Sequence, residues 1–144
     1  MKSKHLQKCV TYYYKNFHTM DNRTDDLLKI RLGVKTATLS DNMSPDEHFQ
    51  NATIRPAIKF QSQLLIEAFK NYAQKHKGVF YDLPAEKKMG YIENAIQKDM
   101  KFRNSLKGMV IGVFTVEEYK HYIQNSSALN KRMMNIVIER LKDN

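Results

Sequence analysis

Histidines and acids are the first residues to consider for catalysis or metal binding, and in this chain they are dispersed. No two histidines lie three or four positions apart, so no histidine pair shares a helix face as a helical metal site requires; they are His5, His18, His48, His76 and His121. Glu117 and His121 do have helical spacing and could together hold a metal or orient a base. Because exposed pairs of this kind are common, we interpret it as a surface pair. We therefore predict no metal site and no cofactor.

Nucleophiles are equally sparse. Cys9 is the only cysteine, so an internal disulfide is excluded and a reducing, cytoplasmic setting is expected. The serines lack the Gly-x-Ser-x-Gly context of a hydrolase, and the glycines form no phosphate-binding loop. Glu86, Glu93 and Asp99 are better explained as solvated helix faces than as an acid–base pair. We predict no catalytic residue, and the sequence favours a non-enzymatic function.

The chain is strongly basic, with 24 Lys and Arg against 15 Asp and Glu, which gives a net charge of +9. Such a charge attracts polyanions in general, although it also serves solubility alone. The longest apolar run, Met109 to Phe114, is far shorter than the roughly 20 residues that a membrane span needs. We therefore expect a soluble protein.

Residues 115–142 have the proportions of a helix-turn-helix: a short helix, a three-residue turn and a longer helix. In that arrangement Asn130, Lys131 and Asn135 would face base edges, with Arg132 at the phosphate backbone. An ordinary antiparallel helix pair fits the same pattern, so both interpretations stay open. Elsewhere a basic row at near-helical spacing could contact phosphates without specificity; it consists of Lys98, Lys101, Arg103 and Lys107.

The first 19 residues differ from the rest of the chain. They carry four lysines, no acid and a run of three tyrosines, without helical periodicity. One interpretation is a basic arm whose tyrosines stack on bases or pack on the domain. The other is an extension that precedes a native start at Met20, because the composition changes at that methionine. We favour the second, which leaves residues 20–144 as a single domain.

Helical signals follow in sequence. A short helix is predicted after Asn22 or Thr24, with Leu28, Ile30 and Leu32 on its apolar side, and residues 35–42 form a loop. The capping box Ser44-Pro45-Asp46-Glu47 begins a long helix with two apolar rows. One row runs through Phe60 and Leu64, and the other through Ile58 and Leu65, so burial on more than one side is expected. Pro56 should kink or break this helix.

From Pro84 the helical period continues without interruption to Val113. A second capping box, Thr115-Val-Glu-Glu118, begins a short helix, and the final helix follows the turn Asn125-Ser-Ser127. No segment shows the alternation or the paired turns of a sheet protein. We predict an all-α, single-domain bundle of five or six helices.

Residues 20–142 resemble a family of small bacterial proteins. The resemblance rests on Tyr91-Ile-Glu-Asn-Ala-Ile-Gln-Lys-Asp99, Phe102-Arg-Asn-Ser-Leu-Lys-Gly108, Phe114-Thr-Val-Glu-Glu-Tyr119 and Asn125-Ser-Ser-Ala-Leu-Asn-Lys-Arg132. It implies an all-helical fold and assigns no active-site residue. Members of this family are sometimes labelled glyoxalases, but the metal-binding histidine sets of those enzymes do not occur here, so we treat that label only as a distant alternative.

Together these observations favour a protein-interaction or regulatory module. Self-association through Met133 and Met134 of the final helix is one expected mode, because methionine-rich faces adapt to partners. The alternative is a nucleic-acid-binding regulator that uses the helix pair of residues 115–142.

Overall fold

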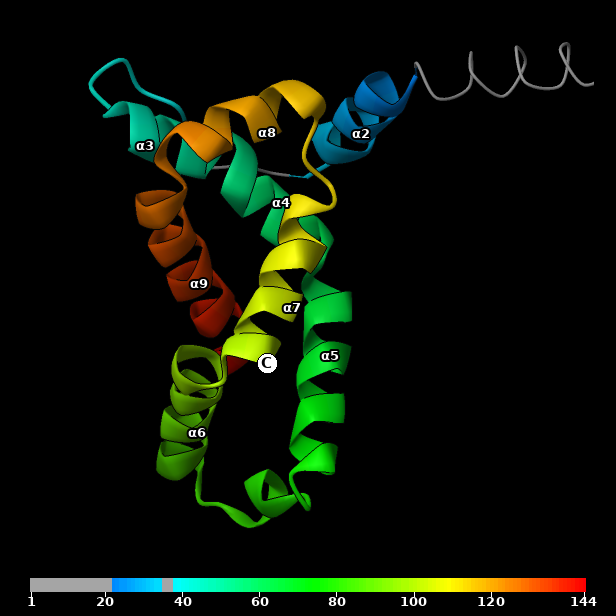
Figure 1. The fold of residues 1–144 in the computed structure, drawn as a ribbon, viewed down its shortest axis with the longest axis vertical. Helices are drawn as coiled ribbons and strands as arrows, with labels where there is room; N and C mark the ends of the chain where they lie inside the picture. Colours follow the sequence, from blue (N-terminus) through cyan, green and yellow to red (C-terminus); the bar gives the residue numbers. More distant parts are fainter. Residues whose placement is uncertain (1–21, 35–37) are drawn as a thin grey trace, which may run out of the picture.

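The computed structural model describes residues 22–34 and 38–144 as an assembly of helices (Figure 1). No strand occurs in these two ranges. If the segments from Pro45 to Lys75 are counted as one interrupted helix, the ranges hold six helices, which confirms the predicted all-α class. The predicted basic tail, residues 1–19, lies outside the described residues. No helix in the described part is long and apolar enough to cross a lipid bilayer.

The first described helix, α2 (Arg23–Leu32), contradicts the apolar side that the sequence suggested. Leu28, Ile30 and Leu32 are 44%, 47% and 83% exposed, whereas Arg31 is buried. The helix is attached to the body by Arg23, whose guanidinium nitrogens donate to the carbonyl oxygens of Phe114 and Gly112 at 2.9 and 3.0 Å. Polar contacts therefore position α2, and a pattern of apolar residues could not predict its orientation.

The long helix is interrupted where proline predicted a break. It consists of α3 (Pro45–Phe49), the π-helix η1 (Gln50–Ile54), α4 (Arg55–Phe60) and α5 (Ser62–Lys75). Ser44 accepts the backbone N–H of Glu47, as expected for the N-cap. Pro56 has no N–H, and its ring would collide with the carbonyl of the residue four positions earlier. The wider π turn just before Pro56 accommodates this, and the Arg55 N–H bonds to the Gln50 carbonyl five residues back.

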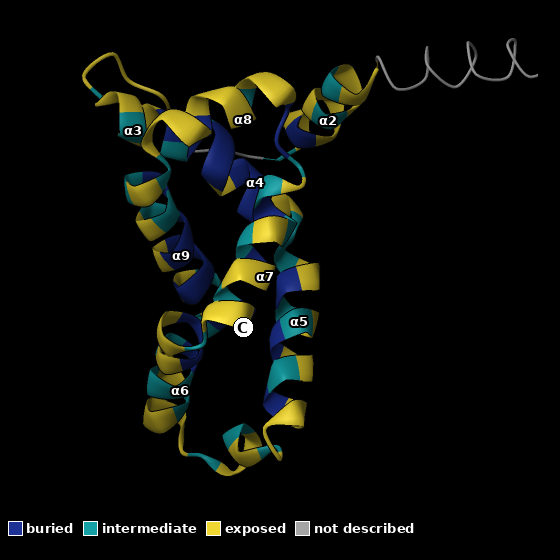
Figure 2. Cartoon of the chain, viewed as in Figure 1, coloured by how far each residue is buried: buried dark blue, intermediate teal, exposed yellow. Residues whose placement is uncertain are grey.

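Only one of the two apolar rows of this helix is buried beyond Pro56 (Figure 2). Ile58, Leu65 and Phe69 lie in the core, whereas Phe60 and Leu64 are 43% and 48% exposed. The expected burial on two sides is therefore wrong at Phe60 and Leu64, while Ala68 and Tyr72, further along the same row, are half-buried against the core. The sequence pattern did not distinguish the row that other helices cover from the row that they leave uncovered.

The helix predicted from Pro84 to Val113 is two helices. After the 3-10 turn η2 (Val79–Asp82), α6 (Ala85–Lys98) ends at Asp99, and α7 (Met100–Ile111) begins there. Asp99 is extended, and its carboxylate accepts the backbone N–H groups of Lys101 and Phe102 at 3.1 Å. This N-cap allows the chain to change direction while the apolar period continues on both sides.

The last helices close the core. The capping box of α8 (Val116–Tyr122) is complete, since Thr115 and Glu118 exchange hydrogen bonds. The short 3-10 segment η3 (Ile123–Asn125) replaces the predicted turn and leads into α9 (Ser126–Lys142). Helix α9 packs against α4, α5, α6, α7 and η1, which makes it the centre of the bundle. Met133 and Met134 are 0% and 1% exposed, so they belong to this core and form no surface for self-association.

Candidate functional site

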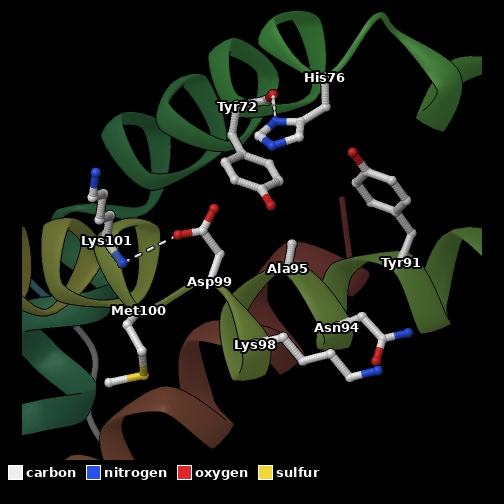
Figure 3. A pocket seen from close by; sticks show the side chains of 9 residues that line it. All are labelled: Tyr72, His76, Tyr91, Asn94, Ala95, Lys98, Asp99, Met100 and Lys101. Atoms are coloured by element: carbon white, nitrogen blue, oxygen red, sulfur yellow. Dashed lines mark hydrogen bonds between the residues drawn. The ribbon is translucent and has the colours of Figure 1, made fainter.

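An open groove of about 600 Å³ lies where α5, α6 and α7 meet, and we call it the phenol groove (Figure 3). Helix α5 contributes Tyr72 and is followed by its C-cap His76, and α6 contributes Tyr91 and Ala95. The break between α6 and α7 adds further polar and charged groups. The residues that line the groove are Tyr72, His76, Tyr91, Asn94, Ala95, Lys98, Asp99, Met100 and Lys101.

Tyr72 is held in a stack of rings on one side of the groove. Its ring lies 4.1 Å from that of Phe102 and 4.1 Å from that of His76, measured between ring centroids. The His76 Nδ1 donates to the Tyr72 carbonyl oxygen at 2.9 Å, which fixes the imidazole against the helix end. Both faces of the Tyr72 ring are therefore covered, and its hydroxyl group points at Asp99 (Figure 3).

Asp99 links the helix break to the groove. The backbone N–H of Phe102 contributes most to a lowered pKa of this carboxyl, and the Tyr72 hydroxyl and the Lys101 N–H act in the same direction. Burial raises the pKa of the Tyr72 phenol, and the nearby Asp99 carboxylate adds to that effect. Asp99 thus serves as an ionised hydrogen-bond acceptor, and its lowered pKa makes it a weak general base.

This lowered pKa predicts a pH dependence of stability. Because the folded-state pKa of Asp99 lies below the ordinary value of 3.8, the carboxylate stabilises the fold fully above that value, and the contribution disappears as the pH falls through the folded-state pKa. Asp99→Asn keeps an N-cap acceptor without the charge, so we expect the stability of this variant to fall less on acidification. Urea unfolding at neutral and acidic pH measures the difference. An Asp99 carboxyl that titrates above 3.8 by NMR would contradict it.

Tyr91 and the lysines form the other side and the mouth of the groove. Burial raises the pKa of the Tyr91 phenol, whose hydroxyl group points toward His76 (Figure 3). Lys98 ends α6 and Lys101 is the second residue of α7, so the break at Asp99 brings both side chains to the groove, with their amines pointing away from each other (Figure 3). The predicted basic row is thus divided between two helices, with Arg103 and Lys107 further along α7.

A second polar cluster lies at the other end of the fold, around Glu118. Its Oε1 accepts from the Arg31 Nη2 at 2.6 Å and from the Thr53 hydroxyl at 3.3 Å, and its Oε2 accepts the Thr115 N–H at 2.8 Å. Arg31, Thr53 and Thr115 are all buried. One carboxylate therefore joins α2, the π-helix and the start of α8.

Two hollows flank this cluster. The one between α3 and α8, about 430 Å³, has His48, Glu117 and His121 among its lining residues. The His121 ring stacks on Phe49 at 4.8 Å, and the Glu117 carboxylate accepts from Lys120 at 2.8 Å. No group of three or more His, Cys, Asp or Glu side chains in the described part of the chain is arranged to hold a metal. The predicted Glu117–His121 pair thus contacts neighbouring side chains, while Cys9 lies outside the described residues.

The four candidate nucleic-acid contacts on α9 have different environments. Lys131 and Asn135 are exposed, as that hypothesis requires. The Asn130 Oδ1 accepts from the Tyr122 hydroxyl at 2.7 Å, and Arg132 donates to the Gln50 side-chain oxygen at 3.0 Å. Two of the four side chains are therefore engaged within the protein and would have to exchange partners to contact bases or phosphates.

Sequence reasoning missed the phenol groove because the residues from Tyr91 to Lys101 seemed to lie on a single helix, and no pattern indicated that Tyr72 and His76 lie beside them. One local signal was available: Asp99 is a favoured N-cap type in the middle of the predicted helix. No comparable signal marked Arg31, since a basic residue in a short polar helix predicts exposure.

Comparisons with known proteins add no assignment. No protein-family profile, curated protein or solved structure matches the chain. The resemblance to the bacterial family therefore stays a prediction.

Proposed function

We propose that this protein is a non-enzymatic interaction module that binds an acidic segment of a partner protein in the phenol groove. The observation that carries the proposal is the combination of a recessed aromatic surface with two lysines at its mouth. Ligand sites combine apolar surface with a few polar groups that converge on the ligand, and this groove has both. An apolar side chain of the partner would lie over Ala95 between the two tyrosines.

The charge at the groove supports an acidic partner. Lys98 and Lys101 both line the groove and supply two positive charges there. The single acid, Asp99, already accepts two backbone N–H groups of α7 and faces Tyr72. Carboxylates on either side of the partner's apolar side chain would therefore be attracted by the lysine amines. No comparable group of acids in the groove would repel them.

The ring geometry favours a protein segment over a nucleic-acid strand. Single-stranded nucleic acids are bound by aromatic rings with a free face on which bases stack. Both faces of the Tyr72 ring are occupied, by His76 and Phe102. The competing hypothesis, duplex DNA on α9, depends on Lys131 and Asn135, which are exposed.

Charge reversal at the groove tests the proposal. The probe is a short fluorescein-labelled peptide with a central leucine flanked by glutamates, followed by fluorescence anisotropy at low salt. We expect Lys98→Glu/Lys101→Glu to weaken binding about tenfold, because two rim contacts are lost and become repulsive. Added salt should weaken binding to the unchanged protein.

The matched control is Lys87→Glu/Lys131→Glu, which changes the net charge equally at two exposed positions outside the groove. This control should retain most of the peptide affinity. Equal losses in both double variants would refute the groove as the site. Duplex DNA provides the test of the competing hypothesis. If the protein binds it in a salt-sensitive manner, and Lys131→Glu abolishes that binding while Lys98→Glu/Lys101→Glu does not, α9 is the interface.

A further inference from the structure

Arg31 has hydrogen-bonding groups that the fold does not use. Its side chain is 6% exposed, and its Nη2 donates to Glu118 at 2.6 Å. The Nε and Nη1 atoms are buried and have no hydrogen-bond partner in the described part of the protein. Buried polar groups are almost always paired, so two unpaired nitrogens on one guanidinium call for an explanation.

Arg31 is also one of the residues that line a hollow of about 240 Å³ between α2 and α4. Arg31 and Glu118 form its polar part, while Leu28, Leu32 and Pro56 contribute apolar walls. Leu32 is 83% exposed, the largest fraction among the large apolar side chains of the described residues. One small region therefore combines unpaired donors with uncovered apolar surface.

Glu118 holds the guanidinium in place. Both of its carboxylate oxygens are engaged, one by Arg31 and Thr53 and the other by the Thr115 N–H. Because Thr115 is the N-cap of α8 and Thr53 lies in the π-helix, Glu118 is fixed by two elements of the core. Arg31 is thus preorganised, and a ligand would bind without first ordering the side chain.

We propose that the hollow between α2 and α4 is a binding site for a small carboxylic acid with an apolar body. The ligand carboxylate would accept from one of the two unpaired Arg31 nitrogens, since charge-assisted bonds to arginine are the strongest that such donors form. The apolar body would lie against Leu28, Leu32 and Pro56 and remove their surface from water. This site is formed by other helices than the phenol groove and does not depend on the function proposed for it.

Hexanoate is a suitable probe. Hexanol, which keeps the apolar chain, and acetate, which keeps the carboxylate, are its control compounds. We expect hexanoate to raise the melting temperature and to shift the Arg31 Nε–H signal in NMR spectra in a saturable manner. Acetate lacks the apolar body and hexanol lacks the charge, so each should bind at least tenfold more weakly. Hexanol binding as tightly as hexanoate would refute the role of Arg31.

Two variants on α2 locate the site without disturbing the core. Leu32→Asp places a carboxylate on the wall of the hollow and should reduce hexanoate affinity at least tenfold. Ile30→Asp is the matched control, because Ile30 is also exposed on α2 but does not line the hollow. The proposal is wrong if the two variants bind hexanoate equally. It is also wrong if hexanoate shifts the NMR signals of many surface lysines without saturation.

Discussion

Replacing Glu118 with glutamine is expected to lower the free energy of unfolding by about 3 kcal/mol, because it leaves the buried Arg31 charge without a counter-ion. The side chain of Arg31 is 6% exposed and that of Glu118 is 19% exposed, so water compensates the lost carboxylate only in part. The Thr53 hydroxyl also loses a charged acceptor. Urea unfolding monitored by circular dichroism measures the change.

Glutamine is chosen because it removes the negative charge of Glu118 but keeps an oxygen that can cap the helix. A capping box accepts either Glu or Gln at the third helical position, so the bond to the Thr115 N–H can persist in Glu118→Gln. The control is Glu117→Gln on the neighbouring residue, whose side chain is 78% exposed. That change should alter stability by no more than about 0.5 kcal/mol.

A double variant tests whether the buried charge is the cause. Arg31→Met combined with Glu118→Gln removes both charges and leaves an apolar side chain of similar length, an exchange that is often neutral or stabilising in proteins. We expect it to recover most of the stability that Glu118→Gln loses. If the double variant is the less stable of the two, the pairing of Arg31 with Glu118 does not explain the effect.

Replacing Met133 with alanine is expected to cost about 3 kcal/mol, because the truncation leaves a cavity at the centre of the bundle. Met133 is fully buried on α9, the helix that contacts most of the others. Met133→Leu conserves the volume and should cost less than about 1.5 kcal/mol. Chemical unfolding of both variants provides the comparison.

The same variants test the self-association expected from the sequence. If Met133 and Met134 formed a surface between copies, alanine would change the oligomeric state at little cost in stability. Because both are core residues, we expect light scattering to give the same molar mass for the folded variant and the unchanged protein. Dissociation of a dimer in Met133→Ala, with an unchanged unfolding curve, would contradict the assignment to the core.

The amino-acid sequence by itself determined the helical class and several boundaries of this protein. The N-caps Ser44 and Thr115 and the disruption near Pro56 could be predicted because each depends on bonds between residues within five positions of one another. The structure buries Leu129 and Val137, which recur on one face of α9 at the helical period, but the sequence suggested a surface role for Met133 on that same face.

The tertiary structure decided which residues from different helices come together in the two candidate sites. Arg31 and Glu118 are 87 positions apart, and the groove joins Tyr72 to residues beyond Tyr91 through a helix break that the apolar period conceals. A periodic pattern shows that a helix has an apolar face, but it does not show which neighbour covers that face. Long-range packing therefore left Leu32, Phe60 and Leu64 exposed, buried Arg31, and brought two phenols, a carboxylate and two lysine side chains to one groove.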